Sequence, residues 1–348
     1  MRLKTISCPL CRSSNFVEVY RRKLDWLNYE YVNVVCKECG FIYRNPSMDY
    51  DDYLEFYENG GLLSSNQFIN YDESSRSNIV RDLRTKFIFE NLSIKSGKIM
   101  DIGGGNGFLL ENFNPDSWER YLLEPGPLTD DVSSDIHVFK GGIEDFYYSS
   151  TFDLISMMSV LEHLQNPRSA IKKIHKLLTN DGYLVIEVPN SLNPSIKISD
   201  FYSFEHISGF TLETIEYLLN CEGFQIIKTN FYKLIPDIHK IAKKSAKTNP
   251  KKPKNAYREI FNVFQEYKAQ KHEFQNRIYE QIKIVFDKTL KGKVTIFGAG
   301  EHTMQLLQLF KFMENVSCFL DSDPKKQGKI FLNKPILNPG DLKILEYI

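Results

Sequence analysis

The chain has 348 residues and a mass of 40.6 kDa, more than one compact core usually holds, which predicts two or three domains. Its 44 basic and 44 acidic residues cancel, so no global field indicates a nucleic-acid or membrane partner. Hydrophobic residues make up 42%, yet no apolar stretch has the length of a signal peptide core or a membrane span. We therefore expect a cytoplasmic globular protein with reduced cysteines.

Four cysteines near the N-terminus form two C-x-x-C pairs, and they are Cys8, Cys11, Cys36 and Cys39. Two such pairs supply four thiolates for a tetrahedral Zn²⁺ ion with no open position, so the predicted site is structural. We assign residues 1–48 to a zinc-binding module, because a bound metal stabilises a segment too small to fold alone. Cys221 and Cys318 stand alone and are interpreted as core thiols.

Strand and helix patterns alternate from residue 76 to residue 235, after a connecting segment at 49–75. Helices are predicted over RSNIVRDLRTKFIFENL, NGFLLENF, SVLEHL, PRSAIKKIHKLL and TLETIEYLLNCEG. Apolar strands are predicted over KIMDI, RYLLEP, FDLISMMS, DGYLVIEVP and FQIIKTNFY. Apolar strands that alternate with helices predict an α/β domain whose parallel sheet is covered on both faces.

The remaining sequence divides into two parts. Residues 236–291 begin with HKIAKKSAKTNPKKPK, whose seven lysines predict a solvated linker, and continue with a long helix. A nucleic-acid patch is the alternative, although no aromatic residues are interleaved with the charge. Residues 292–348 contain strand KVTIFGAG, helix EHTMQLLQLFKFM and strand VSCFLD, which predict a small C-terminal Rossmann-like βαβ unit.

The stretch IMDIGGGNGF at 99–108 has the order strand, glycine turn and helix start, which brings backbone close to a nucleotide. No lysine follows the turn, which excludes a P-loop. A dinucleotide fingerprint requires glycines at its first, third and sixth positions, and the sixth position here is Phe108. The glycines assigned to ligand binding are Gly103, Gly105 and Gly107.

Acidic residues around this turn indicate the charge of the ligand. The Asp101 carboxylate would oppose a pyrophosphate by about 4 kcal/mol at about 4 Å and an effective dielectric of about 20, and would attract a cation. S-adenosylmethionine carries two positive groups and no phosphate, and its carboxylate would use the amides of the turn. Glu124, at the end of RYLLEP, is expected to accept the ribose hydroxyls, and Asp145 the adenine amino group.

The motifs DIGGGNG and FDLISMMSVLEHL, with Glu124 and Asp145, resemble those of class I S-adenosylmethionine-dependent methyltransferases over about residues 76–235. The order of zinc module, this domain and a small Rossmann-like unit resembles nucleotide-sugar C-methyltransferases of deoxysugar and surface-polysaccharide pathways. This resemblance implies S-adenosylmethionine as cofactor and a nucleotide-sugar as small-molecule substrate. It also implies that GAGEHT at 298–303 helps to hold the nucleotide-sugar, although its imperfect fingerprint leaves a packing role open.

The same resemblance implies a catalytic pair. Glu205-His206, in the connection after DGYLVIEVP, matches a Glu-His pair whose histidine is the base on a carbon next to a ketone. Tyr202 lies one position away from the tyrosine of those enzymes and is added to the catalytic set. Ser159 replaces their usual Asn and is assigned to cofactor binding, while His163 of VLEHL is interpreted as mainly structural.

Two other functions remain open on the sequence. In the first, the enzyme methylates oxygen or nitrogen of another small metabolite, and His206 deprotonates a hydroxyl or has no role. In the second, the protein is a non-catalytic zinc-ribbon and Rossmann binding protein that recognises nucleic acid or a partner. The intact Asp101, Glu124 and Asp145 favour an enzyme.

Overall fold

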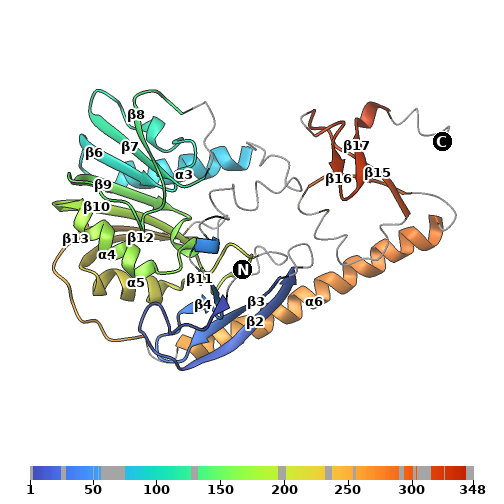
Figure 1. Cartoon of the computed structure of the whole chain (residues 1–348), viewed down its shortest axis with the longest axis horizontal. Helices are drawn as coiled ribbons and strands as arrows, with labels where there is room; N and C mark the ends of the chain where they lie inside the picture. The colour runs from blue at the N-terminus through green and yellow to red at the C-terminus, as the bar shows by residue number, and fades with distance from the viewer. Residues whose placement is uncertain are drawn as a thin grey trace. The chain divides into compact units, whose positions relative to one another are not determined.

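The computed structural model describes residues 3–24, 29–49, 51–53, 55, 75–126, 132–194, 201–231, 237–253, 256–289, 294–300, 303, 315–324 and 326–341. The chain divides into two compact units (Figure 1). The first comprises Met1–Asn59 and Glu73–Tyr267, and the second comprises Gly60–Asp72 and Lys268–Ile348. Among the described helices, none combines the length and apolarity needed to cross a lipid bilayer.

A seven-stranded sheet forms the centre of the first unit, in the order β12-β13-β10-β9-β6-β7-β8. Its strands are β6 (Gly97–Ile102), β7 (Trp118–Glu124), β8 (Ile136–Lys140), β9 (Phe152–Met158), β10 (Leu178–Pro189), β12 (Phe224–Phe231) and β13 (Asp237–Lys244). All neighbours are parallel except β13, which is antiparallel to both β10 and β12. The predicted α/β Rossmann-like class is confirmed, but the sheet is mixed rather than wholly parallel. Strand order reverses between β6 and β9, which opens a crevice at their carboxyl ends.

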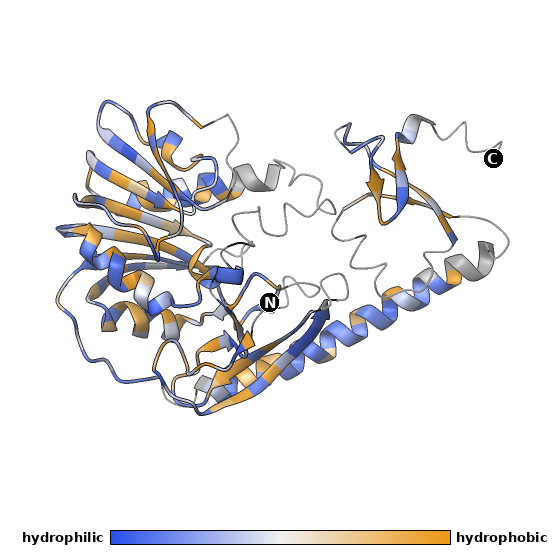
Figure 2. Ribbon diagram, viewed as in Figure 1, coloured by the Kyte–Doolittle hydropathy of each residue, from blue (hydrophilic) through white to orange (hydrophobic). Residues whose placement is uncertain are grey.

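Helices cover both faces of this sheet: α3 (Ser75–Asn91), α4 (Pro167–Leu177) and α5 (Leu212–Cys221). Phe87 of α3 packs with Ile99 and Leu154 on one face. Helices α4 and α5 pack on the other face, where Met100 and Ile155 lie in the same core cluster. Successive strand residues point to opposite faces, so Ile99 and Met100 belong to different clusters. Figure 2 shows hydrophobic residues concentrated in the strands.

The cysteine module, residues 1–48, contains short antiparallel strands: β1 (Leu3–Lys4), β2 (Phe16–Leu24), β3 (Tyr29–Cys36), β4 (Ile42–Arg44) and β5 (Ser47–Met48). Strand β1 pairs with β5, while β2, β3 and β4 form a sheet completed by β11 (Ser208–Gly209). Strand β11 comes from the central domain, in the connection between β10 and α5. Phe41 and Tyr43 also share a core cluster with Phe210 and the central sheet, so module and domain have one continuous core.

The lysine-rich segment departs from its prediction, because residues 237–244 form β13 inside the sheet. Ile238, Ile241 and Ala242 are buried there. The Lys240 side chain is also buried, and its ammonium bonds the Thr229 hydroxyl at 2.7 Å and the Glu216 carboxylate. The linker and domain boundary predicted at 236 are therefore wrong for these residues, while 245–253 contain no helix or strand.

Two predicted helices are single 3-10 turns, η2 (Leu110–Asn112) and η3 (Leu161–His163). Positive φ values at Gly105 (57°) and Gly107 (80°) exclude an α-helix at the start of NGFLLENF. Strand β8 was not predicted. The other predicted strands and helices of the central domain are confirmed, as is the long helix α6 (Ala256–Thr289).

The second unit contains a smaller sheet in the order β14-β15-β17-β16. Its elements are β14 (Val294–Phe297), β15 (Val316–Leu320), β16 (Ile330–Phe331), β17 (Lys334–Leu337) and the 3-10 turn η6 (Pro339–Asp341). Strands β14, β15 and β17 are parallel, which confirms the two predicted strands and adds a third. The helix predicted over EHTMQLLQLFKFM and most of the connecting segment at 49–75 lie outside the described residues.

Candidate active site

The four cysteines of the module converge on one point. The sulfurs of Cys8 and Cys39 are 3.7 Å apart and those of Cys11 and Cys36 are 3.5 Å apart. All four lie within 4.8 Å of one another. Since a Zn–S bond is about 2.3 Å long, sulfurs at the corners of a regular tetrahedron are about 3.8 Å apart. The residues therefore fit a tetrahedral Zn²⁺ ion closely.

Gly103 opens the glycine turn after β6 in a conformation that disfavours a side chain. Its φ is +67°, and a Cβ atom there would lie 2.4 Å from a methyl group of Val160. The backbone of the turn therefore packs directly against the Val160 side chain, at the start of η3, and leaves no space for a side chain at residue 103. The Gly103 amide donates to the Leu123 carbonyl at 2.7 Å, which ties the turn to β7.

Glu124, at the end of β7, holds this turn through its carboxylate. Its oxygens accept hydrogen bonds from the amides of Gly105 at 2.9 Å and Gly126 at 2.7 Å. Asp101 is 3% exposed and accepts a hydrogen bond from the Ser156 hydroxyl at 2.7 Å. Burial raises the pKa of Asp101 to about 7, so its charge near neutral pH is partial. Its carboxylate also lies against the turn, because a Cβ atom on Gly104 would come within 2.3 Å of an Asp101 oxygen.

A cavity of about 230 Å³ opens at the carboxyl ends of β6 and β7. Its lining includes three of the predicted cofactor residues, Gly103, Glu124 and Ser159. Glu144 also lines it, a contribution that the sequence did not predict. Among the fourteen described residues of the lining, two are glutamates and none is Lys or Arg.

The remaining predicted cofactor residues lie near this cavity without lining it in the described part of the chain: Asp101, Gly105, Gly107 and Asp145. Gly105 reaches the cavity indirectly, through its hydrogen bond to Glu124. The neighbour of Asp145, Glu144, lies in the wall instead. Burial raises the pKa of the Glu144 carboxyl.

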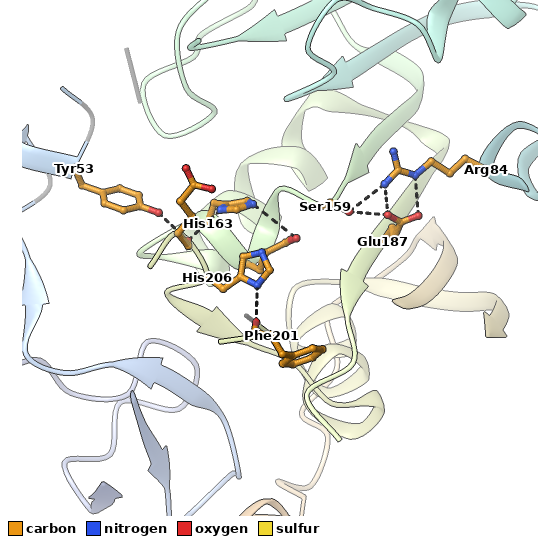
Figure 3. Close-up of polar contacts among 9 residues, drawn as sticks. Tyr53, Arg84, Ser159, His163, Glu187, Phe201 and His206 are labelled. Atoms are coloured by element: carbon orange, nitrogen blue, oxygen red, sulfur yellow. Dashed lines mark hydrogen bonds and ion pairs between the residues drawn. The ribbon is translucent and has the colours of Figure 1, made fainter. Parts of the chain in front are cut away.

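Ser159 belongs to a buried ion-pair network on the opposite wall (Figure 3). Its hydroxyl donates to Glu187 of β10 at 2.6 Å and accepts from Arg84 of α3 at 3.1 Å. Arg84 Nε also donates to Glu187 at 2.9 Å. Burial opposes the charge of Glu187, but the hydrogen bonds and charges of its neighbours, Arg84 above all, together outweigh burial and lower the pKa of Glu187. This network fixes Ser159, whose φ of 56° is unusual for a residue with a side chain.

Two histidines meet beside the cavity. His163 lines it, and the ring centroids of His163 and His206 are 5.1 Å apart in an edge-to-face arrangement (Figure 3). His163 Nδ1 lies 3.0 Å from the Glu205 carbonyl, and His206 Nδ1 lies 3.2 Å from the Phe201 carbonyl. A carbonyl only accepts, so each Nδ1 carries the proton and each Nε2 carries the lone pair of the neutral ring. Burial lowers the pKa of His163 to about 4.

Glu162 is a third proton-accepting group at this place, and sequence reasoning missed it. It is 2% exposed, and neither carboxylate oxygen has a hydrogen-bond partner among the described residues. One oxygen lies 3.8 Å from His163 Nε2. Burial holds the pKa of Glu162 well above its usual range. Its position beside the VLEHL histidine was visible in the sequence, but its burial was not.

The other predicted catalytic residues are placed by hydrogen bonds of the loop formed by residues 201–207, which we call the histidine loop. Glu205 accepts at its backbone carbonyl from both His163 and Tyr53. Tyr202 is 4% exposed and donates its hydroxyl to the Ser191 carbonyl at 3.0 Å. Its ring stacks on Phe264 of α6. The structure therefore engages the Tyr202 side chain in packing, outside the cavity wall.

A sequence profile described as a methyltransferase domain matches residues 73–229. These residues form a methyltransferase domain. The match begins just before α3 and ends in β12, so it contains the glycine turn, both histidines and every described residue of the cavity lining except Tyr53. The methyltransferase domain accounts for 157 residues, and the profile does not extend to the cysteine module or the second unit.

Curated relatives match over the same region. A tRNA U34 carboxymethyltransferase of Sulfurimonas denitrificans is 29% identical over 126 residues, which are 33% of this chain and 41% of that protein. A ubiquinone biosynthesis O-methyltransferase of Aliivibrio fischeri is 27% identical over 132 residues, which are 34% of this chain and 54% of that protein. The chain thus spans about half the length of the curated relatives that it matches.

Solved structures are similar at low identity. The 1,6-didemethyltoxoflavin-N1-methyltransferase of Burkholderia thailandensis has a TM-score of 0.43 and 12% identity over 62% of this chain and 96% of its own. Magnesium protoporphyrin IX methyltransferase of Synechocystis has a TM-score of 0.43 and 12% identity over 57% of this chain and 100% of its own.

Proposed function

We propose that the protein transfers a methyl group from S-adenosylmethionine to a small-molecule acceptor, with a nucleotide-linked sugar as the acceptor class. The observation that carries the proposal is the cavity beside the glycine turn. Its described lining contains the carboxylates of Glu124 and Glu144 and no lysine or arginine. Such a lining suits a positively charged nucleoside and disfavours a phosphate.

The residues of this chain that would hold the cofactor follow from their donors and acceptors. The glycine turn would bring its backbone close to the cofactor, and Glu124, which also accepts from the Gly105 and Gly126 amides, would accept from the ribose hydroxyls. Glu144, with its neighbour Asp145, would accept from the adenine amino group. When bound, the cofactor supplies a methyl group on a sulfonium, a good leaving group for in-line displacement.

His206 is the proposed general base. Since the cavity is assigned to the cofactor, a base for the acceptor is expected beside the cavity, which is where His206 lies. Its Nε2 lone pair would take a proton from the acceptor carbon or hydroxyl, leaving the electron pair there to form the bond to the methyl carbon. The proton would remain on His206, and the electron pair left on the acceptor would be available to the methyl group that the cofactor supplies, with sulfur as the leaving group. Glu205 contributes its backbone carbonyl, which orients His163.

The order of cysteine module, methyltransferase domain and C-terminal α/β unit supports a sugar acceptor in deoxysugar or polysaccharide biosynthesis, through the family resemblance alone. An O- or N-methyltransferase of another metabolite is the alternative. A methylated amine would need no proton transfer to His206 before attack, so the two versions differ in their dependence on this residue.

We also infer a structural Zn²⁺ ion bound by Cys8, Cys11, Cys36 and Cys39, on the fit of their sulfur separations to a tetrahedron. Elemental analysis of the purified protein is expected to find one zinc per chain. A Cys36→Ser variant is expected to lose it.

Incubation with methyl-labelled S-adenosylmethionine and a panel of nucleotide-sugars, phenols and amines tests the reaction. Mass spectrometry is expected to find one added methyl on a nucleotide-sugar, with its position given by NMR. His206→Asn is expected to abolish transfer while calorimetric binding of S-adenosylhomocysteine is retained. His272→Asn, an exposed site on α6, is the matched control.

A methyl group found on a phenol or amine would favour the alternative acceptor. Tight binding of NADH or ATP, with no binding of S-adenosylmethionine or S-adenosylhomocysteine, would contradict methyl transfer and favour a binding protein.

A further inference from the structure

The backbone of the histidine loop is held almost entirely by residues 31–53. Five of its carbonyls accept hydrogen bonds from that segment: Tyr202 from Tyr31 Oη at 2.7 Å, Ser203 and His206 from Arg44 Nη2 at 3.1 and 3.2 Å, Glu205 from Tyr53 Oη at 3.1 Å, and Ile207 from the Arg44 amide at 2.9 Å. The loop then continues into β11, which pairs with β4. Such dense anchoring is unusual for a loop, because most connecting segments bond to water.

Arg44 is the centre of this arrangement. It is 3% exposed, its guanidinium lies 4.0 Å from the centroid of the Tyr31 ring, and its Nε donates to Asn33 at 3.0 Å. No carboxylate in the described part of the chain pairs with it. Burying a guanidinium without an acid is costly, and here the compensation comes from loop carbonyls and the Tyr31 ring. Arginine suits this role because its planar fork fixes several acceptors at once.

An anchored carbonyl orients the His163 imidazole, and Arg44 holds the backbone of His206. The Glu205 carbonyl that Tyr53 holds also accepts from His163 Nδ1, which sets the tautomer of the ring in the cavity wall. Arg44 Nη2 holds the backbone carbonyl of His206, and the His206 ring donates from Nδ1 to the Phe201 carbonyl. Behind His206 lies a cavity of only about 10 Å³, lined by Asn33 and Glu162 among others, so the ring has little space to turn away.

We propose that Arg44 is a positioning residue for the two histidines, and that the cysteine module thereby completes the methyltransferase site. The inference rests on the proposed function, because it assumes that these histidines handle the acceptor proton. Strand β3 carries Tyr31 and Asn33 and ends at Cys36, and β4 follows Cys39. Metal at the four cysteines therefore fixes both strands that hold the histidine loop.

The test compares Arg44→Lys with Arg21→Lys in the full chain. Arg21 lies in the same module, is exposed and pairs with Glu18 and Glu30, away from the loop. For Arg44→Lys we expect amide exchange in residues 203–209 to accelerate roughly tenfold or more, the worth of hydrogen bonds to a charged group. Exchange in β6 and β9 is expected to stay at the wild-type rate, as it is throughout Arg21→Lys.

Two further readouts separate positioning from general stability. The imidazole nitrogen spectra of His163 and His206, assigned with His163→Gln and His206→Asn, are expected to change from single tautomers to mixtures in Arg44→Lys. The dissociation constant of S-adenosylhomocysteine, measured by calorimetry, is expected to stay within about twofold, because the cofactor residues share no partner with Arg44. Tyr31→Phe, which removes one hydroxyl, is expected to accelerate loop exchange about fivefold and decides the matter if Arg44→Lys does not fold.

Unchanged exchange and unchanged histidine spectra in both variants would overturn the proposal. Uniform acceleration across the loop and the central sheet would also overturn it, since Arg44 would then be merely structural. Failure of the proposed function is a separate result. The wild-type protein would then not bind S-adenosylhomocysteine, whether or not the exchange rates of the histidine loop change in the variants.

Discussion

The two glycine turns of the chain share a plan and differ in the surroundings of their acid. In the methyltransferase domain, β6 leads into Gly103, and Glu124 at the end of β7 accepts the Gly105 amide at 2.9 Å. In the second unit, β14 leads into Gly298, and Asp321 after β15 accepts the Ala299 amide, also at 2.9 Å. The carboxylate of the next strand thus fastens the turn in both.

Their charges are balanced differently. Asp321 also bonds the Lys326 ammonium at 3.1 Å, whereas the described partners of Glu124 are backbone amides only. Burial opposes the charge of Asp321, but its hydrogen bonds outweigh burial and lower its pKa. Glu124 faces a cavity with no lysine or arginine in its described lining, and so keeps its negative potential for a ligand. The same motif can therefore serve a ligand in one place and only the fold in another.

The largest expected effect comes from a side chain placed in the first turn. Gly103→Ala adds a Cβ at 2.4 Å from Val160 and at a φ of +67°. Strain and overpacking together are expected to lower the free energy of unfolding by about 2–5 kcal/mol, measured by urea denaturation. Gly300→Ala is the matched control, because a Cβ there meets no atom of the described residues within 4 Å. Equal stability of the two variants would show that the first turn has no special geometry.

The acids themselves give the next effect. Glu124→Gln removes the charge beside the cavity and is expected to weaken S-adenosylhomocysteine binding roughly 10- to 100-fold, the worth of charge-assisted hydrogen bonds. Asp321→Asn is expected to leave this affinity unchanged in the same calorimetric titration. A loss of affinity in Asp321→Asn, with Glu124→Gln unaffected, would reverse the assignment of the two turns.

The smallest effect concerns His163, which lines the cavity next to the first glycine turn. Its pKa of about 4 is below the ordinary 6.5, so between these values the unfolded chain binds a proton that the folded chain does not. Stability from this group is complete above pH 6.5 and falls as pH decreases through the window, by about 2 kcal/mol at pH 5. His163→Gln is expected to remove this part of the loss between pH 7 and pH 5, in denaturation curves at both values. His272→Gln serves as control, and parallel curves for His163→Gln and wild type would contradict the assignment.

Local pattern was enough to predict the strands that position the site. β6, β9 and β10 are apolar over most of their length, and such runs flanked by helical periodicity indicate a covered sheet. It was not enough for β13, where lysines dominate the composition although Ile238 and Ile241 are buried. A buried lysine such as Lys240 depends on Glu216 and Thr229, which lie on other elements.

The site shows the same division. Motif spacing predicted Gly103 and Glu124, and the family resemblance predicted Ser159; all three line the cavity. It did not predict Arg44 or Arg84, because each acts through partners more than 100 residues away along the chain, Ser203 for the first and Glu187 for the second. Sequence separation of this size leaves no local signal, so only the fold brings these arginines to the site.

The continuous core that joins Phe41 and Tyr43 to Phe210 has a practical consequence. A shortened protein that starts at residue 73 would keep every residue of the matched domain, yet would expose to solvent the aromatic side chains that the module covers. We expect such a fragment to precipitate or to need a detergent. Exchange of the first 48 residues between relatives would likewise succeed only if residues 201–210 were exchanged with them. The two segments should therefore be transferred together in any chimaeric protein.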